Sequence, residues 1–374
     1  MRKIQITNGM FVAMVVNLIF AKAIGVTQGV LARSIGQDMW VATLLGTLQG
    51  AAMMYIAYLA IRRTPHLNYI ELGDLLLGKW FGKLIALLIF VFYLAAFGPV
   101  MITFVYHLKD YFLPEAPYWL FTSSALIIGS IGCFYGLEVM ARIALIGSLF
   151  IFLLNTLIII GSMKEFDIRN LLPLLEHGFP LTAAASLHFD ADWALAIMLA
   201  ALILPFVNGA AAYGRKLSVV SILASGMVIV IWAILEGAVL SAEVTSQYTI
   251  SCMKLARNAH IGNFLQRYEM IMIALYSFSI LFEVMFCIYG TSVSISKIFG
   301  LKSHKVMIAP VCIVLGLFGT WVVRDHFRAI TYLENDWPRI ALPIAFSLPL
   351  LMLGLRMLMR KKLNQAVQSQ HGES

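Results

Sequence analysis

Long hydrophobic stretches recur from one end of the chain to the other, and short polar segments separate them. Each stretch holds roughly 20 predominantly apolar residues, enough for a helix to cross about 30 Å of hydrocarbon. The pattern predicts an all-α integral membrane protein with a single polytopic domain, residues 1–374. We expect its ten transmembrane helices at about 9–33, 40–61, 82–108, 117–135, 138–163, 183–209, 217–241, 266–290, 305–323 and 338–359.

Two of the predicted helices are interrupted at corresponding places. In the first, apolar sequence ending at Ile24 runs into Gly25-Val-Thr-Gln-Gly29 before it resumes. In the sixth, Pro205 removes an amide donor and a flexible Asn-Gly pair follows. Paired breaks in the first helix of each five-helix half indicate a five-plus-five inverted repeat, as in secondary transporters. The alternative is that these are ordinary glycines and prolines, which are common in membrane helices.

Composition and charge support this class. Of 374 residues, 61% are hydrophobic and 12% are charged, about half the charged share of an average soluble domain. The formal net charge is +8, but the basic residues gather in alternate connecting segments, which predicts that both termini are cytoplasmic. The charge therefore reports topology, and we expect no nucleic-acid partner.

Signatures of catalysis or metal binding are missing from the sequence. The four cysteines form no CxxC pair and show no Cys/His metal-ligand spacing. The sequence also lacks a phosphate-binding Gly-rich loop and a nucleophile elbow. We therefore predict no enzyme activity, no catalytic residue, no cofactor and no metal.

Several short segments, taken in their order and spacing, carry a resemblance to a known family. They are Gly36-Gln-Asp-Met-Trp40, Glu71-Leu-Gly-Asp-Leu-Leu-Leu-Gly78, Tyr135-Gly-Leu-Glu138, Leu204-Pro205-Phe206 and Arg267-Tyr-Glu269. Together they resemble the spore germination permease family, the B-type subunits of nutrient germinant receptors, over nearly the whole chain.

The resemblance implies a LeuT-like fold of the amino acid–polyamine–organocation superfamily. It implies a receptor in the spore inner membrane that senses a nutrient, often an amino acid, together with an A-type membrane subunit and a C-type lipoprotein. The chain departs from the family pattern at Glu283, where the eighth span commonly carries a lysine.

The first interruption is the main candidate for a ligand site. Amides of Val26, Thr27 and Gly29 would form the positive end of an outer half-helix, which can bind a carboxylate, and Gly25 would allow close approach. Carbonyls freed by Pro205, those near Leu204 included, could accept hydrogens from an ammonium group. Such a pair of breaks fits a zwitterion and favours a small-molecule amino acid. Alternatively, Gly25 and Gly29 serve only close helix packing.

Residues of the third, sixth and eighth predicted helices are candidates for the pocket of the ligand's side chain. They are Val100, next to a Gly-Pro pair in the third helix, Leu199 in the sixth and Thr291 in the eighth. Their character favours a ligand of modest hydrophobic size, such as alanine, valine or leucine. General helix packing is the alternative for each.

Charged residues within hydrocarbon are expensive and need a partner or a water path. Lys22 lies one turn before the first break, and Glu283 lies near the centre of the eighth helix. We predict that they pair, the ammonium standing where related transporters bind a coupling cation. Alternatively, Lys22 snorkels, or it pairs with Glu236 or with backbone carbonyls. Asn17, Asn155 and the serines of the fourth predicted helix are expected to form interhelical hydrogen bonds.

Three functions remain open at this point. The first is a receptor subunit that binds an amino acid and triggers germination through its partners. The second is an active amino-acid permease coupled to an ion or a proton. A passive ion channel is the third, although the sequence shows no filter motif. We expect the polar segments Lys164–Asp192 and Glu243–Arg267 to form the ligand entrance and the partner surfaces.

Overall fold

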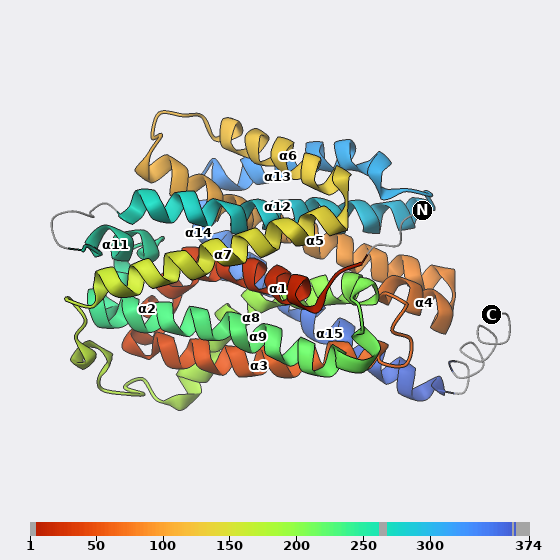
Figure 1. Cartoon of the computed structure of the whole chain (residues 1–374), viewed down its shortest axis with the longest axis horizontal. Helices are drawn as coiled ribbons and strands as arrows, with labels where there is room; N and C mark the ends of the chain where they lie inside the picture. The colour runs from red at the N-terminus through yellow and green to blue at the C-terminus, as the bar shows by residue number, and fades with distance from the viewer. Residues whose placement is uncertain (1–4, 262–267, 361–362, 364–374) are drawn as a thin grey trace.

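The computed structural model describes residues 5–261, 268–360 and 363, and of Lys22 and Ala211 it describes the backbone alone. Helices form nearly all of this part of the chain (Figure 1). The long elements are α1 (Asn8–Lys22) with its continuation α2 (Gln28–Ile35), α3 (Met39–Ile61), α5 (Lys79–Tyr111), α6 (Tyr118–Tyr135), α7 (Leu137–Ser162), α8 (Phe179–Ile203), α9 (Ala210–Leu235), α12 (Tyr268–Phe299), α13 (Ile308–Val323) and α15 (Trp337–Leu358). Four short helices connect them: α4 (Tyr69–Leu77), α10 (Ala242–Gln247), α11 (Ser251–Asn258) and α14 (His326–Thr331).

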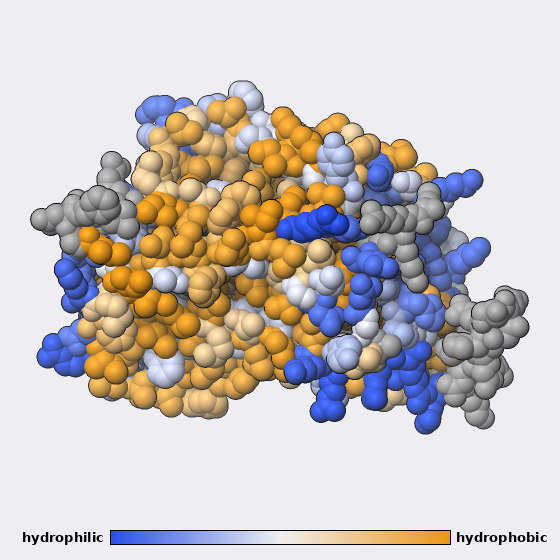
Figure 2. Space-filling view, viewed as in Figure 1, coloured by the Kyte–Doolittle hydropathy of each residue, from blue (hydrophilic) through white to orange (hydrophobic). Residues whose placement is uncertain are grey.

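The outer surface of the helix bundle is apolar. In the face shown in Figure 2, hydrophobic residues cover the middle, and hydrophilic residues gather towards the ends, most densely at the end where α4 lies. Leu149 and Phe152 of α7 and Leu317 of α13 are 63%, 71% and 71% exposed. Because large apolar side chains at this density are costly in water but not in hydrocarbon, the chain is a multi-pass membrane protein.

The first and sixth predicted helices form the centre of the bundle. The α1 helix packs against α7, α8, α9 and α12. Of the most apolar 18-residue stretch of α8, 89% is buried inside the protein, whereas the corresponding share for α7 is 28%. Residues on α1 and α8 are therefore shielded from lipid, which allows these helices to carry polar groups at membrane depth.

The first interruption lies at the predicted residues but has a different form. The chain does not unwind at Gly25; it continues from α1 into α2 through a five-residue π-helix, η1 (Ala23–Thr27), all of it buried. In a π-helix the backbone bonds from residue i to residue i+5, so it exposes no half-helix terminus. The prediction of free amides at positions 26–29 is therefore wrong for this conformation, and the irregularity that motivated it is present.

The second interruption lies at Pro205, as predicted, but at the end of its helix and not within it. The α8 helix is continuous to Ile203, and Pro205 falls in a short 3-10 turn, η4 (Leu204–Phe206), at its end. There the Ile6 amide donates to the Phe206 carbonyl over 3.0 Å, and the Asn208 amide donates to the Ile6 carbonyl over 2.8 Å. Proline ends the helix because it cannot continue the hydrogen-bond ladder. The break predicted for mid-membrane is thus at the end of the helix.

A proline in the middle of α5 is tolerated because another helix supplies its missing hydrogen bond. Pro99 has no amide to donate to the Ala95 carbonyl four residues earlier. The Tyr332 hydroxyl, in the π-helix η7 (Tyr332–Asp336), donates to that carbonyl over 2.9 Å. Gly98 makes room for the ring, since a Cβ there would lie 2.5 Å from Tyr332. The Gly-Pro pair therefore couples α5 to the start of α15.

We expect Tyr332→Phe to lower the free energy of unfolding by about 1–3 kcal/mol, because it leaves the buried Ala95 carbonyl without a donor. In a Pro99→Ala background the restored amide satisfies that carbonyl, and the same tyrosine change should cost less. Thermal unfolding in detergent of both single variants and the double variant measures the coupling. Equal costs in both backgrounds would contradict this account.

Both asparagines predicted to join helices do so. The Asn17 side-chain amide donates to the Ala144 carbonyl of α7 over 2.8 Å, and the Ser279 hydroxyl of α12 donates to its oxygen over 2.8 Å. The Trp232 indole of α9 donates to the Asn155 amide oxygen over 2.5 Å. The prediction is confirmed for both asparagines, whose bonds hold the central helices in register. It is wrong for the serines of α6, since Ser123, Ser124 and Ser130 donate to carbonyls of their own helix.

Candidate functional site

Three side chains from two long helices surround Gly25 in the π-helix η1. A Cβ at this position would lie 2.6 Å from Thr103 Cγ2, 3.0 Å from the Tyr276 hydroxyl and 3.3 Å from His107 Cε1. Thr103 and His107 are one turn apart on α5, and Tyr276 is on α12. Only glycine allows helices to approach this closely, so the packing role weighed for Gly25 is met in this conformation.

The end of η1 is bonded directly to α8. The Thr27 hydroxyl donates to the Asp192 carboxylate over 2.6 Å, and both side chains are buried. Two residues earlier, Asp190 accepts from the Trp193 indole over 2.8 Å on the side of α8 that faces α3. The expected polar segment 164–192 is therefore wrong at its end, since α8 begins at Phe179 and includes both aspartates.

The short helix α11 covers this region from one end of the bundle. His107 Nδ1 lies 2.6 Å from the Thr103 carbonyl, which can only accept, so Nδ1 carries the proton. In a neutral ring, Nε2 is then the acceptor, and it lies 3.6 Å from the Cys252 sulfur of α11. Burial raises the pKa of the Cys252 thiol well above its usual range, which keeps it protonated and able to donate.

A second π-helix, η5 (Glu236–Leu240), also borders α11. It begins at Glu236, whose side chain is fully buried. The Ser251 hydroxyl lies beside this carboxylate but outside hydrogen-bond geometry. Short π-helical segments inside α-helices often occur at functional sites. Two of them, η1 and η5, contact α11, so we take this end of the bundle as the candidate site.

The polar groups between these elements are not saturated. Within the part of the chain that is described, no hydrogen-bond partner exists for the hydroxyls of Thr103, Tyr276 and Ser251 or for either Glu236 carboxylate oxygen. All four side chains are at least 98% buried. Since buried polar groups are normally hydrogen-bonded, this set indicates a site that completes its bonds with a polar ligand. Hydroxyls can donate to a carboxylate, and a carboxylate can accept from an ammonium group.

The predicted residues divide into groups. Gly25, Val26 and Thr27 lie together in η1 and are buried. Gly29, one turn further on in α2, packs against the Tyr248 carbonyl, where a Cβ would lie 2.5 Å away. It therefore serves close packing against the segment that follows α10 rather than the set around Gly25.

Three predicted residues lie near the opposite end of the bundle. Leu204, the first residue of η4 after α8, follows Asp192 by about 18 Å at 1.5 Å per residue, and Pro205 is next to it. On α12, Thr291 follows Tyr276 by about 22 Å by the same measure, and its hydroxyl donates to the Cys287 carbonyl of its own helix. The structure does not bring these residues to η1. The carbonyls near Leu204 therefore do not face the amides of η1, as the zwitterion model required.

Two further candidates lie between these groups. Val100 is on α5 about one turn from Thr103, and Leu199 is on α8 about two turns from Asp192. Both side chains are fully buried. They can line the deeper wall of a site centred on η1, which remains a prediction.

Glu283 is fully buried near the middle of α12. The Lys22 side chain lies outside the part of the chain that is described. The predicted pair between them therefore stays a prediction.

Sequence reasoning missed His107, Tyr276 and Asp192 as site residues. Asp192 had a usable signal, since an ionisable residue next to a long apolar run is a candidate functional residue by default. His107 and Tyr276 had none, because their importance comes from facing Gly25 across two helix interfaces. Among the described residues, no group of three or more His, Cys, Asp and Glu side chains could hold a metal ion.

Ion pairs close the bundle at both ends. Near η1, Arg33 of α2 pairs with Glu334 of η7 at 2.7 Å and donates to the Ser246 carbonyl of α10 over 3.2 Å. Towards the other end, Lys297 of α12 pairs with Asp74 of α4. These contacts join segments that lie far apart in the sequence.

Comparison with known proteins places the chain among germination proteins. A family model described as "Spore germination protein" matches residues 5–322. The chain is 22% identical over 367 residues to spore germination protein KB of Bacillus subtilis (strain 168), covering 94% of each. It is 26% identical over 360 residues to YndE of the same organism, covering 93% of this chain and 95% of the relative. GerQB of Bacillus cereus is 24% identical over 330 residues, with 82% and 87% covered.

Two solved structures share the fold. Mhp1, a nucleobase-cation-symport-1 family transporter in a closed conformation with bromovinylhydantoin bound, gives a TM-score of 0.72 at 13% identity, covering 96% of this chain and 80% of that one. MhsT in complex with L-phenylalanine gives 0.63 at 11% identity, covering 95% and 90%. Both are LeuT-fold transporters, so the predicted five-plus-five architecture is confirmed. The matched family and the structural neighbours are permeases and transporters rather than enzymes.

Proposed function

Because the chain belongs to the spore germination permease family, we propose that it is the B-type membrane subunit of a germinant receptor that binds a nutrient amino acid beside η1. The observation that carries the proposal is a set of buried, unsatisfied groups on elements that meet at α11. The Thr103 and Tyr276 hydroxyls lie at Gly25, and the Ser251 hydroxyl and the Glu236 carboxylate belong to α11 and to η5, which contacts it. This set is complementary to a zwitterion, because it offers donors for a carboxylate and an acceptor for an ammonium group.

The proposed site differs from the first prediction in how it holds the ligand. Side-chain hydroxyls replace the free amides of a half-helix, and Glu236 replaces carbonyls at the end of α8. The site is closed in this conformation, since Thr103, His107 and Tyr276 fill the space around Gly25. Ligand binding would therefore separate these side chains from η1, and α11, which contacts η1, η5 and α12, would move with them. A ligand that prefers the separated arrangement shifts the population towards it.

The partners and the location complete the proposal. We infer an A-type membrane subunit and a C-type lipoprotein as the partners that read this shift, and the spore inner membrane as the location. Both termini are assigned to the cytoplasmic side. Basic residues near the end of the bundle formed by α4 support that side, since Arg63, Arg356 and Arg360 line one hollow there.

An active permease is the second candidate. It is favoured by the fold of the two neighbours and by the ion pairs at both ends, Arg33 with Glu334 and Asp74 with Lys297. A protein that closes at either end can admit and release a ligand on alternate sides. Uptake of the bound amino acid into proteoliposomes would support the permease, and a germination defect without uptake would support the receptor.

Thermal-shift screening of the purified chain against the twenty amino acids tests the proposal. We expect one or a few of them to stabilise the protein, by about 2.7 kcal/mol at 100 times the dissociation constant. The same compounds with an acetylated amino group or an amidated carboxyl group serve as matched controls and should fail to bind, because each lacks one charge of the zwitterion. Stabilisation by none of the twenty, or equally by the blocked forms, would refute the site.

A further inference from the structure

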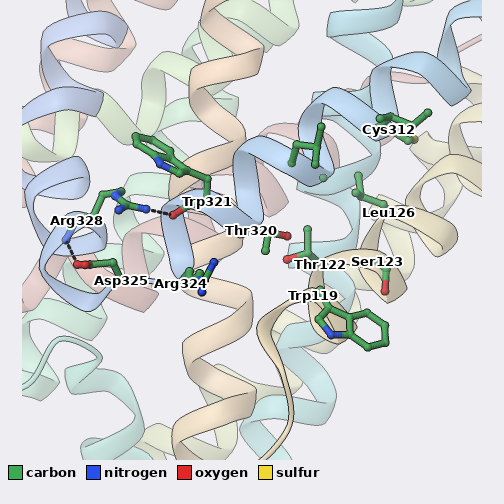
Figure 3. A pocket seen from close by; sticks show the side chains of 13 residues that line it. Trp119, Thr122, Ser123, Leu126, Cys312, Thr320, Trp321, Arg324, Asp325 and Arg328 are labelled. Carbon is green, nitrogen blue, oxygen red and sulfur yellow. Dashed lines mark hydrogen bonds between the residues drawn. The ribbon is translucent and has the colours of Figure 1, made fainter.

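A lipid-facing groove lies between α6 and α13, away from the site around η1. Its volume is about 790 Å³, and Figure 3 shows side chains of both helices lining it. Both helices are peripheral. Of the most apolar 18-residue stretch, 39% is buried in α6 and 33% in the span that contains α13. On the rim, Trp119 is 60% exposed and Trp321 is 52% exposed. The groove therefore opens towards the hydrocarbon of the membrane.

The groove changes character along its length. At one end Leu126, Cys312 and Gly316 make it apolar, and towards the other end Thr122 and Thr320 add hydroxyls. From Cys312 to the turn after α13 it runs for about 18 Å at 1.5 Å per residue, close to the roughly 15 Å that one leaflet contributes to the hydrocarbon core. This length and polarity match an acyl chain with its ester region towards the hydroxyls.

Two arginines stand at the polar end. The Arg328 guanidinium donates to the Trp321 carbonyl over 2.5 Å and lies 4.4 Å from the centre of the Trp321 ring, which holds it in one orientation. Arg324 has no ion-pair partner among the described residues. Asp325 accepts from the Arg328 amide as the helix cap of α14. The end is thus net positive and sits at the tryptophan level, where lipid headgroups lie.

We propose that this groove binds an anionic phospholipid of the outer leaflet, with its phosphate at Arg324 and Arg328 and one acyl chain along Gly316. Arginine forks bind phosphate through paired hydrogen bonds. A transmembrane helix of a partner would instead leave both arginines against apolar side chains unless it brought its own acid. Gly316 keeps the groove open, because its absent Cβ has a single neighbour within 4 Å, Leu126 Cδ1 at 3.0 Å.

Quenching of tryptophan fluorescence by brominated lipids tests this proposal on the full chain in lipid nanodiscs. The Trp321 signal is the difference between the wild type and Trp321→Phe. We expect acyl-brominated phosphatidylglycerol to quench this signal at lower mole fraction than brominated phosphatidylcholine. The preference should be about fivefold for each arginine, and it should shrink as salt is added.

Variants separate the headgroup contact from the groove itself. Arg324→Gln with Arg328→Gln should abolish the preference, whereas Arg339→Gln, an exposed arginine on α15, should keep it. Gly316→Leu should reduce quenching by filling the groove, and Gly354→Leu, where a Cβ meets nothing within 4 Å, serves as its control. Equal quenching by both lipids, a preference that survives the double arginine change, or no effect of Gly316→Leu would each overturn the proposal. Competition by dissolved inorganic phosphate at low concentration would assign the arginines to a free anion instead.

Discussion

Glu236→Gln is expected to weaken amino-acid binding by at least about 30-fold, because loss of one partner from a buried charge pair costs about 2 kcal/mol or more. The same change should leave the stability of the ligand-free protein unchanged or raise it. Glu236 is fully buried and, within the described residues, lacks a hydrogen-bond partner, so a neutral amide of the same shape removes a desolvation cost. Opposite effects on binding and on stability distinguish a ligand contact from a structural residue.

The measurement pairs a binding assay with thermal unfolding of the same preparations. The dissociation constant for the amino acid found in the screen is compared between the wild type, Glu236→Gln and Glu243→Gln. Glu243 is an exposed glutamate on the neighbouring α10 and should behave as the wild type. Unchanged affinity in Glu236→Gln, or a loss of affinity that follows a loss of stability, would remove Glu236 from the site.

Gly25→Ala is expected to abolish ligand binding and to lower the free energy of unfolding by about 1–3 kcal/mol, the usual cost of overpacking a tight interface. Its new methyl group would lie 2.6 Å from Thr103 Cγ2 and 3.0 Å from the Tyr276 hydroxyl. The first distance is too short for two carbon atoms and the second is tight, so the Thr103 side chain, α5 or η1 must shift. The same methyl would occupy the place where the ligand has to approach.

A second substitution shows whether the effect comes from this contact. Thr103→Ser removes Cγ2 and keeps the hydroxyl, so Gly25→Ala in that background should recover most of the lost stability. Gly9→Ala, at the start of α1, is the matched control, since a Cβ there meets nothing within 4 Å. Normal binding by Gly25→Ala would place the ligand site away from η1.

Prediction from the sequence succeeded where the cause was local. Hydropathy located the long helices to within a few residues in most cases, for example 138–163 against α7 (Leu137–Ser162). Motif order identified the family, which the family model matches over residues 5–322. Gly25 also pointed to a real irregularity, because a polar, glycine-flanked segment inside an apolar helix disfavours regular α-helix wherever the chain folds.

The errors had a different origin. Pro205 signals the end of a helix, but the sequence does not say how deep in the membrane that end lies; the pairing of Ile6 with Phe206 sets its place. Asp190 and Asp192 fall in both the predicted helix 183–209 and the predicted polar segment 164–192, and their charge alone does not decide between the two. In the structure they are helical and buried, since Trp193 and Thr27 supply hydrogen bonds to them.

Membrane class and helix positions follow from the order of residues along the chain, because the free energy of transfer into hydrocarbon is a sum over the residues of each segment. The family follows from the order of the short motifs. The composition of the proposed ligand site does not follow from the order of residues. Thr103, Glu236, Ser251 and Tyr276 lie on four different elements, and their unsatisfied polar atoms become significant only once α11 and α12 bring them to η1. Whether a buried polar group has a partner is a property of contacts between distant segments, so only the packing of the helices could bring together the residues of the proposed site.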